Sequence, residues 1–162
     1  MSVIRATLCL VVNEGRIVLG RQTRGPFSGY ITPPGGKIEA GERPFACAIR
    51  ECGEETGYTP IHGNETRWLG TIESDGILGR WHVDVFFAGN FQGKLVGKPP
   101  LFARWYHIDS LPLEELVPGD QLWLPRVLRG ERFTGRHEIT TRDGVQNMTY
   151  NFDVAAEPPN LW

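Results

Sequence analysis

The sequence predicts an α+β fold in which β-hairpins and two helices build a layered α-β-α domain. Short runs of alternating apolar and polar residues are separated by turn residues, a pattern typical of hairpins. One longer segment lies between Pro44 and Gly57, residue types that favour the first position and the end of a helix. The chain has 162 residues, of which 40% are apolar and 22% charged, which is typical of one globular domain.

Three hairpin-like regions account for most of the expected strands. Residues 3–12 and 16–20 form the first pair, with Asn13, Glu14 and Gly15 as the turn. Residues 68–74 and 80–88 form the second, joined through Asp75 and Gly76. Residues 102–108 form a further strand, and residues 133–140 and 146–152 form a last hairpin around the turn at residues 142–144.

The helices and the irregular segments follow from the placement of proline and glycine. Residues 24–36 contain too many of both for a helix and end in Pro33-Pro34-Gly35-Gly36. We expect helices over residues 43–56 and, starting at Pro118, over residues 118–129. The domain then spans residues 1–154, and residues 155–162 form a C-terminal tail that either docks on a groove or is mobile, the second being favoured.

Charge and apolar patterning exclude several classes of partner. The formal net charge is -2, so the sequence lacks the basic field of proteins that bind duplex nucleic acid. The apolar run at residues 8–12 is far shorter than the roughly 20 residues that span a membrane. Because no basic leader or cleavage site precedes Asn13, we expect a cytoplasmic protein whose partner is a small charged molecule.

The cysteines and histidines do not form a recognisable metal or disulfide pattern. The three cysteines lack CxxC spacing and are interpreted as small core residues: Cys9, Cys47 and Cys52. The four histidines form no HxxxH pair: His62, His82, His107 and His137. Any hard-metal chemistry is therefore expected to depend on carboxylates.

The predicted helix at residues 43–56 carries such carboxylates. Glu51, Glu54 and Glu55 share one face, beside an apolar face that packs on the core. Arg50 can pair with Glu54, which answers only one of the negative charges. Carboxylate oxygens suit Mg²⁺ or Mn²⁺, ions that also leave coordination positions open for phosphate. The alternative interpretation, a solvated acidic face, would be preferred for an ExxEE motif alone.

A longer motif decides between these interpretations. Gly36 is followed after five residues by Glu42 and, after seven more, by the segment Arg50-Glu51-Cys52-Gly53-Glu54-Glu55-Thr56-Gly57-Tyr58. This pattern resembles the Nudix box, the signature of hydrolases that cleave a nucleoside diphosphate linked to another moiety. Seven fixed positions match, and a chance match in a chain of this length is on the order of one in a million. The resemblance implies the Nudix fold, an α-β-α sandwich with a mixed central sheet.

The resemblance also implies roles for individual residues. Glu51, Glu54 and Glu55 are the expected metal ligands, and Glu51 or Glu54 is expected to assist the attacking water. The carbonyl of Gly35 is implied as a further ligand, which fits a glycine pair where backbone approaches a cation. Glu42 and Arg50 are implied as a structural pair. The implied cofactor is Mg²⁺, with Mn²⁺ as a possible substitute, and no covalent nucleophile is needed.

Beyond the box, residues 5–154 resemble the MutT-type branch of the family, which hydrolyses oxidised purine nucleoside triphosphates such as 8-oxo-dGTP. The resemblance implies that Asp120 contacts the purine edge and that Thr7 and Thr32 lie in the substrate pocket. Trp81 either stacks on the base or belongs to the core, and the residues alone do not decide between the two. Trp123 is expected to pack the second helix against the sheet.

Several positions depart from the pattern of that branch. Val117 replaces a stacking aromatic residue, Gly119 replaces an acid, and Thr32 replaces an asparagine. Pro100 replaces a further acidic ligand, in a segment, residues 91–101, without any carboxylate. The lysines of this segment, Lys94 and Lys98, are expected to meet the triphosphate instead.

Together these features predict a monomeric Mg²⁺-dependent hydrolase that converts a nucleoside triphosphate to the monophosphate and pyrophosphate. Within the family, ADP-ribose, a dinucleotide or capped RNA are alternative substrates. A nucleotide-sensing module without catalysis is a second class, motivated by Pro100 and the altered pocket. A structural scaffold is a third class, but it leaves the acidic stripe unexplained.

Overall fold

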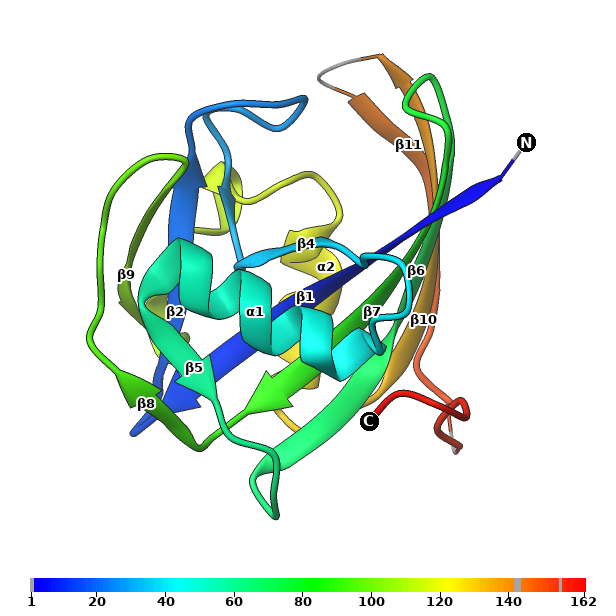
Figure 1. The fold of residues 1–162 in the computed structure, drawn as a ribbon. Helices are drawn as coiled ribbons and strands as arrows, with labels where there is room; N and C mark the ends of the chain where they lie inside the picture. The colour runs from blue at the N-terminus through cyan, green and yellow to red at the C-terminus, as the bar shows by residue number, and fades with distance from the viewer. Residues whose placement is uncertain (1, 142–143, 155) are drawn as a thin grey trace.

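A computed structural model describes residues 2–141, 144–154 and 156–162 and shows one sheet covered by a helix on each face (Figure 1). Its helices are α1 (Pro44–Thr56) and α2 (Asp120–Val127), with 3-10 turns η1 (Ile108–Ser110) and η2 (Leu113–Glu115). Its strands are β1 (Val3–Asn13), β2 (Arg16–Gln22), β3 (Ile31–Thr32), β4 (Gly35–Lys37), β5 (Tyr58–Pro60), β6 (Thr66–Gly76), β7 (Arg80–Ala88), β8 (Phe91–Gly93), β9 (Leu101–His107), β10 (Phe133–Thr141) and β11 (Gly144–Asn151).

The central sheet is mixed, as expected. Within the described residues its strands follow the order β11-β10-β6-β7-β1-β2-β3, with β4 added beside β1 and β9 beside β2. Two neighbours are parallel, β1 with β7 and β10 with β6, whereas the hairpin partners are antiparallel. The two parallel pairs bring segments together that are far apart in the sequence, and they set which side chains share a row across the sheet.

Helix α1 forms over the predicted segment because its two ends carry suitable residues. Pro44 occupies the first turn, where a missing N–H costs nothing. Gly57 ends the helix in the left-handed region at φ 83°, and its N–H bonds to the carbonyl of Gly53. A Cβ on Gly57 would lie 2.0 Å from the carbonyl oxygen of Lys94, so this position also needs glycine for close packing.

Two apolar cores lie on opposite faces of the sheet. Phe45, Ala48 and Cys52 of α1 pack with Trp68 and Phe86 on one face. On the other face the apolar residues of α2 pack against the sheet, and the members of this core that come from α2 are Trp123, Leu124 and Val127. Because α1 and α2 cover opposite faces, the molecule is an α-β-α sandwich, and the predicted fold class is confirmed.

Helix α2 is shorter than predicted at both ends. It begins at Asp120, because Gly119 before it has φ 100°, which a helix cannot contain, and Pro118 lies outside. It ends at Val127, and the chain turns at residues 128–130. The second hairpin also differs: β6 continues through Asp75 and Gly76, so the turn lies at residues 77–79, closed by a hydrogen bond from the Gly79 N–H to the Gly76 carbonyl.

Four short strands were not predicted: β3 and β4 lie within the glycine-rich and proline-rich segment, and β5 pairs with β8 apart from the main sheet. Each has only two or three residues, too few for a period to be visible. The expected turn of the last hairpin is at residues 142–144, of which 142 and 143 lie outside the described residues. No helix of the described chain is long and apolar enough to cross a membrane.

The expectation of a mobile C-terminal tail is wrong for its last residues. Leu161 is buried with 2% of its surface exposed, and its carbonyl accepts a hydrogen bond from the Phe45 N–H at the start of α1. The ring of Trp162 stacks on His62 with centroids 4.7 Å apart and meets the edges of Phe45 and Phe86. Burial of these apolar groups holds the tail beside α1.

Candidate active site

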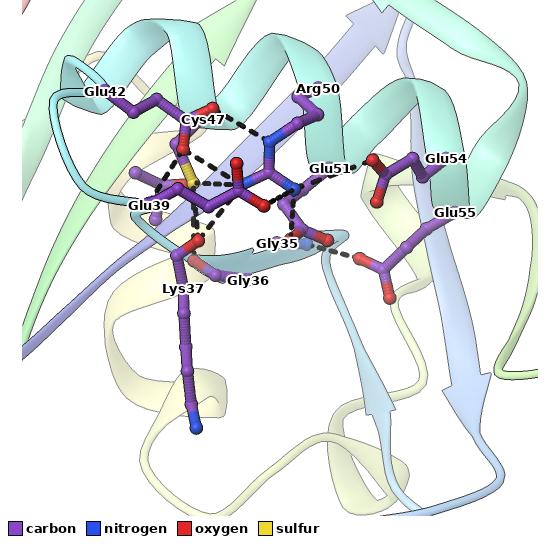
Figure 2. Close-up of polar contacts among 11 residues, drawn as sticks. Gly35, Gly36, Lys37, Glu39, Glu42, Cys47, Arg50, Glu51, Glu54 and Glu55 are labelled. Atoms are coloured by element: carbon purple, nitrogen blue, oxygen red, sulfur yellow. Dashed lines mark hydrogen bonds and ion pairs between the residues drawn. The ribbon is translucent and has the colours of Figure 1, made fainter.

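A cavity of about 650 Å³ opens between the sheet, the segment of residues 22–27, the acidic side of α1 and the start of α2. Seven of the ten site residues named from the sequence line it: Thr7, Thr32, Gly35, Glu51, Glu55, Trp81 and Asp120. The other three, Glu42, Arg50 and Glu54, lie on or before α1 beside the cavity (Figure 2). The fold thus brings together residues from five separate segments of the chain.

Glu42 and Arg50 form a bidentate ion pair at the start of α1. The Arg50 Nε donates to one carboxylate oxygen of Glu42 at 2.8 Å and Nη2 donates to the other at 2.9 Å. These hydrogen bonds lower the pKa of Glu42 from 4.5 to about 2. Nη2 also donates to the Lys37 carbonyl at 3.1 Å, so Arg50 links the helix to β4 (Figure 2).

Arg50 contacts more of the acidic cluster than the sequence suggested. Its Nη1 donates to Glu51 at 2.8 Å and lies 3.6 Å from Glu54 and 3.8 Å from Glu39. The prediction that Arg50 answers only one negative charge is therefore wrong, because one guanidinium lies among four carboxylates. The sequence spacing could not reveal these contacts. Adjacent residues of a helix such as Arg50 and Glu51 start on different sides of it, and only the conformation of the long side chains brings their charged groups together.

Glu51 lies against the backbone of β4. A Cβ on Gly36 would come within 2.3 Å of the Glu51 carboxyl carbon, so only glycine allows this approach. Burial raises the pKa of Glu51 above its usual value, although the hydrogen bond from Arg50 opposes the rise. The carboxylate is therefore partly desolvated and placed where backbone and helix meet.

Glu55 is the most buried acid of the helix face. Its Oε1 accepts a hydrogen bond of 2.7 Å from the Gly35 N–H, which ties the glycine pair to α1 (Figure 2). Burial raises the pKa of Glu55 from 4.5 to about 7, helped by the charges of Glu51 and Glu54 and opposed by the Gly35 hydrogen bond. A nearby cation would favour the charged form of this carboxyl group.

The chemistry of these donors fits a hard divalent cation. Glu51, Glu54 and Glu55 offer only oxygen, beside a backbone that Gly35 and Gly36 allow to come close. In the described part of the chain no three acidic, histidine or cysteine side chains converge on one point. Each of these carboxylates has a partner within the chain: Arg50 donates to Glu51 and lies 3.6 Å from Glu54, and the Gly35 N–H donates to Glu55.

The cations beside the acidic end differ from the expected ones. Arg24 and Lys37 line the cavity, whereas Lys94 and Lys98 do not. Pro100 lines the cavity at the position where the family pattern implies an acid. The expectation that Lys94 and Lys98 meet a triphosphate is therefore not supported by their placement. Arg24, in the glycine-rich loop, lowers the pKa of Glu55 by its charge and so lies near the acidic cluster.

Another part of the cavity wall is formed by Asp120 at the start of α2. The residue is 5% exposed, and one carboxyl oxygen accepts a hydrogen bond of 3.1 Å from the Trp123 indole. Burial raises the pKa of Asp120 from 3.8 to about 7, against the opposing effect of that hydrogen bond. Trp123 itself is fully buried and stacks on Phe133, as expected of a residue that packs α2 on the sheet.

The remaining predicted residues form the walls. Trp81 lines the cavity instead of lying in the apolar core, and its indole N–H donates to the Leu78 carbonyl at 2.7 Å. The hydroxyl groups of Thr7 and Thr32 are engaged elsewhere, with the Cys47 sulfur at 3.3 Å and the Pro33 carbonyl at 3.2 Å. The two threonines therefore shape the wall through backbone and methyl groups.

Five polar residues of the cavity were not predicted as site residues: Gln22, Arg24, Lys37, Ser74 and His137. Lys37 follows the glycine pair directly, so its nearness to the motif was a usable signal. Ser74 and His137 are isolated polar residues in strands, and only the pairing of β6 with β10 places them side by side.

Comparisons with known proteins agree with this geometry. The sequence model of the NUDIX domain matches residues 3–127. The oxidized purine nucleoside triphosphate hydrolase of Danio rerio is 32% identical over 141 residues, covering 86% of this chain and 88% of the relative. The protein of the same name from Mus musculus is 28% identical over 139 residues, with the same coverage.

A solved structure is also similar over almost the whole chain. The MutT protein of Bacillus halodurans superimposes with a TM-score of 0.78 at 28% sequence identity, covering 93% of this chain and 98% of that protein. The matched domain includes β4, α1 and the first residues of the cavity wall in β1. The chain is an enzyme of the Nudix hydrolase family.

Proposed function

We propose that this enzyme hydrolyses a purine nucleoside triphosphate, with preference for an oxidised base, to the nucleoside monophosphate and pyrophosphate. The observation that carries the proposal is the polarity of the cavity. The carboxylates of Glu51 and Glu55 lie near Arg24, and the buried carboxyl group of Asp120 lies beside His137 and Tyr150. The ammonium group of Lys37 lies 5.5 Å from the ring centre of Trp81. A nucleotide has the same division between a charged polyphosphate and a flat, hydrogen-bonding base.

The acidic end would bind a divalent cation, Mg²⁺ or Mn²⁺, through Glu51, Glu54, Glu55 and the Gly35 carbonyl. When bound, this ion would neutralise phosphate charge and orient water for attack on phosphorus. Glu51 or Glu54 would accept the proton of that water. The side chain of Arg24, which lies near Glu55, would hold the phosphate oxygens of the leaving pyrophosphate.

The part of the cavity around Asp120 would select the base. Asp120, with a pKa of about 7, can either donate or accept a hydrogen bond near neutral pH, which suits a purine edge that carries both kinds of group. Trp81 offers an indole ring on the wall, with the Lys37 ammonium group 5.5 Å from the ring centre, and base stacking on such a ring is worth about 1–3 kcal/mol. The names of the Danio rerio and Mus musculus relatives support an oxidised purine as the preferred base.

The test is pyrophosphate release from a nucleotide panel containing 8-oxo-dGTP, 2-oxo-dATP, the unmodified nucleotides and ADP-ribose, with Mg²⁺ or Mn²⁺. We expect the highest kcat/KM for an oxidised purine triphosphate. Glu55→Gln should reduce kcat/KM by at least about 100-fold, as expected on loss of a charged group at the reacting phosphate. The glutamine oxygen can still accept the Gly35 hydrogen bond, so the fold should be kept.

The matched control is Glu114→Gln, which removes the same charge from an exposed residue of η2. Its kcat/KM should equal that of the wild type. If no nucleotide is cleaved with either metal, or if Glu55→Gln retains full activity, the proposal is wrong.

A nucleotide-sensing module is the second candidate, because Pro100 lines the cavity where the family pattern implies an acidic ligand. This alternative predicts that nucleotides raise the melting temperature of both the wild type and Glu55→Gln, while neither protein releases pyrophosphate. The same nucleotide panel therefore separates the two functions.

A further inference from the structure

Three cavity-lining side chains form a row across the sheet at the end that holds Asp120. The register of β10 and β6 pairs His137 with Ser74, and that of β6 and β7 pairs Ser74 with Trp81. Directly paired residues point to the same face of a sheet, and all three line the cavity. The cavity floor therefore presents an imidazole, a hydroxyl and an indole side by side.

His137 is held in one orientation by the neighbouring strand. Its Nε2 lies 2.5 Å from the hydroxyl oxygen of Tyr150 in β11, and the two rings meet edge to face at 79°. Burial lowers the pKa of His137 to about 4 and raises that of Tyr150, so both groups are neutral at physiological pH. Within the described residues the side chain of His137 hydrogen-bonds through Nε2 to Tyr150, and Nδ1 makes no hydrogen bond.

The start of α2 packs directly on this pair. A Cβ on Gly119 would lie 2.7 Å from the Tyr150 hydroxyl and 3.2 Å from Cε1 of His137. Asp120 follows in the chain and lines the same cavity, and its charge contributes to the raised pKa of Tyr150. The Asp120 carboxyl and the His137 imidazole thus bound the same end of the cavity, one from α2 and one from the sheet.

We propose that His137 is a specificity residue that contacts the base beside Asp120, and that Tyr150 is the positioning residue that fixes its ring. The proposal rests on the proposed function and adds a second polar group to the base site. A neutral imidazole bonded through Nε2 leaves Nδ1 for one polar atom of the ligand. Oxidation at C8 gives a purine an extra carbonyl oxygen and converts N7 into an N–H group. The oxidised base therefore has an additional polar atom, on its C8–N7 edge, that can bond to Nδ1 of His137.

The experiment measures binding of 8-oxo-dGMP and dGMP by calorimetry, which requires neither metal nor turnover. His137→Phe keeps an aromatic ring and removes the polar atoms, so it should weaken 8-oxo-dGMP binding by about tenfold, the effect of one lost hydrogen bond to a buried group. Binding of dGMP should change by less than about threefold on the same scale. His137→Gln, which keeps a donor and an acceptor, should bind 8-oxo-dGMP more tightly than His137→Phe.

Tyr150→Phe tests the positioning role. It should weaken 8-oxo-dGMP binding in the wild-type background and have no further effect when combined with His137→Phe, because the ring that it orients is then gone. The matched control is His107→Phe, which replaces an exposed histidine of β9 and should bind like the wild type. Additive effects of the Tyr150 and His137 variants would overturn the positioning role.

The specificity role is overturned if His137→Phe binds 8-oxo-dGMP like the wild type, if both nucleotides lose affinity equally, or if the wild type binds neither. Pyrophosphate release from triphosphates separates this result from the proposed function. Turnover of 8-oxo-dGTP that is unchanged in His137→Phe contradicts only the role of His137. His137-dependent binding of 8-oxo-dGMP without any pyrophosphate release contradicts only the hydrolase proposal.

Discussion

Glu42 owes its low pKa to two hydrogen bonds from a single guanidinium, and this makes stability depend on acid. The folded pKa is about 2, against the ordinary 4.5, so the folded protein holds fewer protons than the unfolded chain in this range. The stabilisation is complete above pH 4.5 and is lost as the pH falls towards 2. Glu42→Gln should therefore lower the free energy of unfolding by about 1–3 kcal/mol at pH 6 and by much less at pH 3.

Urea unfolding of the wild type and Glu42→Gln at both pH values measures this difference. A difference in the free energy of unfolding that stays constant from pH 6 to pH 3 would show that the Arg50 pair is not responsible.

Asp120 has the opposite dependence on pH. Its folded pKa is about 7, against the ordinary 3.8, so the folded protein keeps a proton that the unfolded chain has released. This carboxyl group therefore makes the fold less stable as the pH rises from 3.8 to about 7. The asparagine of Asp120→Asn cannot ionise. The difference in melting temperature between this variant and the wild type should therefore shift in favour of the variant as the pH rises to about 7, and stay constant above that pH. A relative melting temperature independent of pH would contradict the assignment.

Single residues also show why the sequence revealed some of the site and not the rest. Glu51, Glu54, Glu55, Glu42 and Arg50 belong to one local motif, so their spacing was sufficient to name them. The role of His137 depends on Ser74 and Tyr150, which only strand pairing brings to it. A lone histidine in a strand has no periodic or local signal of its own.

At the scale of elements, two glycines allow a direct test of how α1 ends: Gly53 inside the helix and Gly57 directly after it. Gly57→Ala would force a Cβ against the Lys94 carbonyl at φ 83° and should lower the free energy of unfolding by more than about 1 kcal/mol. Gly53→Ala, inside the same helix, meets only Thr59 at 3.4 Å and should raise it by about 0.5–1 kcal/mol. Chemical denaturation of the two variants measures both effects, and a shared sign would contradict this account of the helix end.

The elements that were predicted well are those with signals at both ends. Helix α1 has Pro44 and Gly57, and the long strands have enough residues for alternation to be visible. Helix α2 started two residues later than predicted because Pro118 was a suitable first residue in type, while the backbone at Gly119 interrupts the helix. Strands β5 and β8 pair with each other although more than thirty residues separate them in the sequence, and no local pattern encodes such a pairing.

At the scale of the whole molecule, the C-terminal residues complete the core beside α1. Leu161→Ala should lower the free energy of unfolding by about 2–5 kcal/mol, since the side chain is buried among apolar groups of that core. The control Leu113→Ala changes a residue that is 41% exposed and should be nearly neutral. Both are measured by urea unfolding, and equal effects of the two substitutions would show that the tail contributes no core packing.

The cavity is also a property of the whole molecule. Its walls come from β1, β4, α1, β6, β7, β10 and α2, and the two parallel pairings of the sheet bring the most distant of these together. The acidic end could be predicted because it is built from one stretch of chain. The part of the cavity around Asp120 could be predicted only through family resemblance, since its residues come from separate strands and from the start of α2.

The position of Arg50 among four carboxylates has a consequence for the stability of the fold without a bound metal ion. A tethered guanidinium already serves as counter-ion to the acidic helix, so the negative charges do not drive the helix apart. Small domains that fold only around zinc are unfolded when the ion is scarce. Helix α1 carries its counter-ion within the chain, so we expect the fold to persist when divalent ions are removed by a chelator.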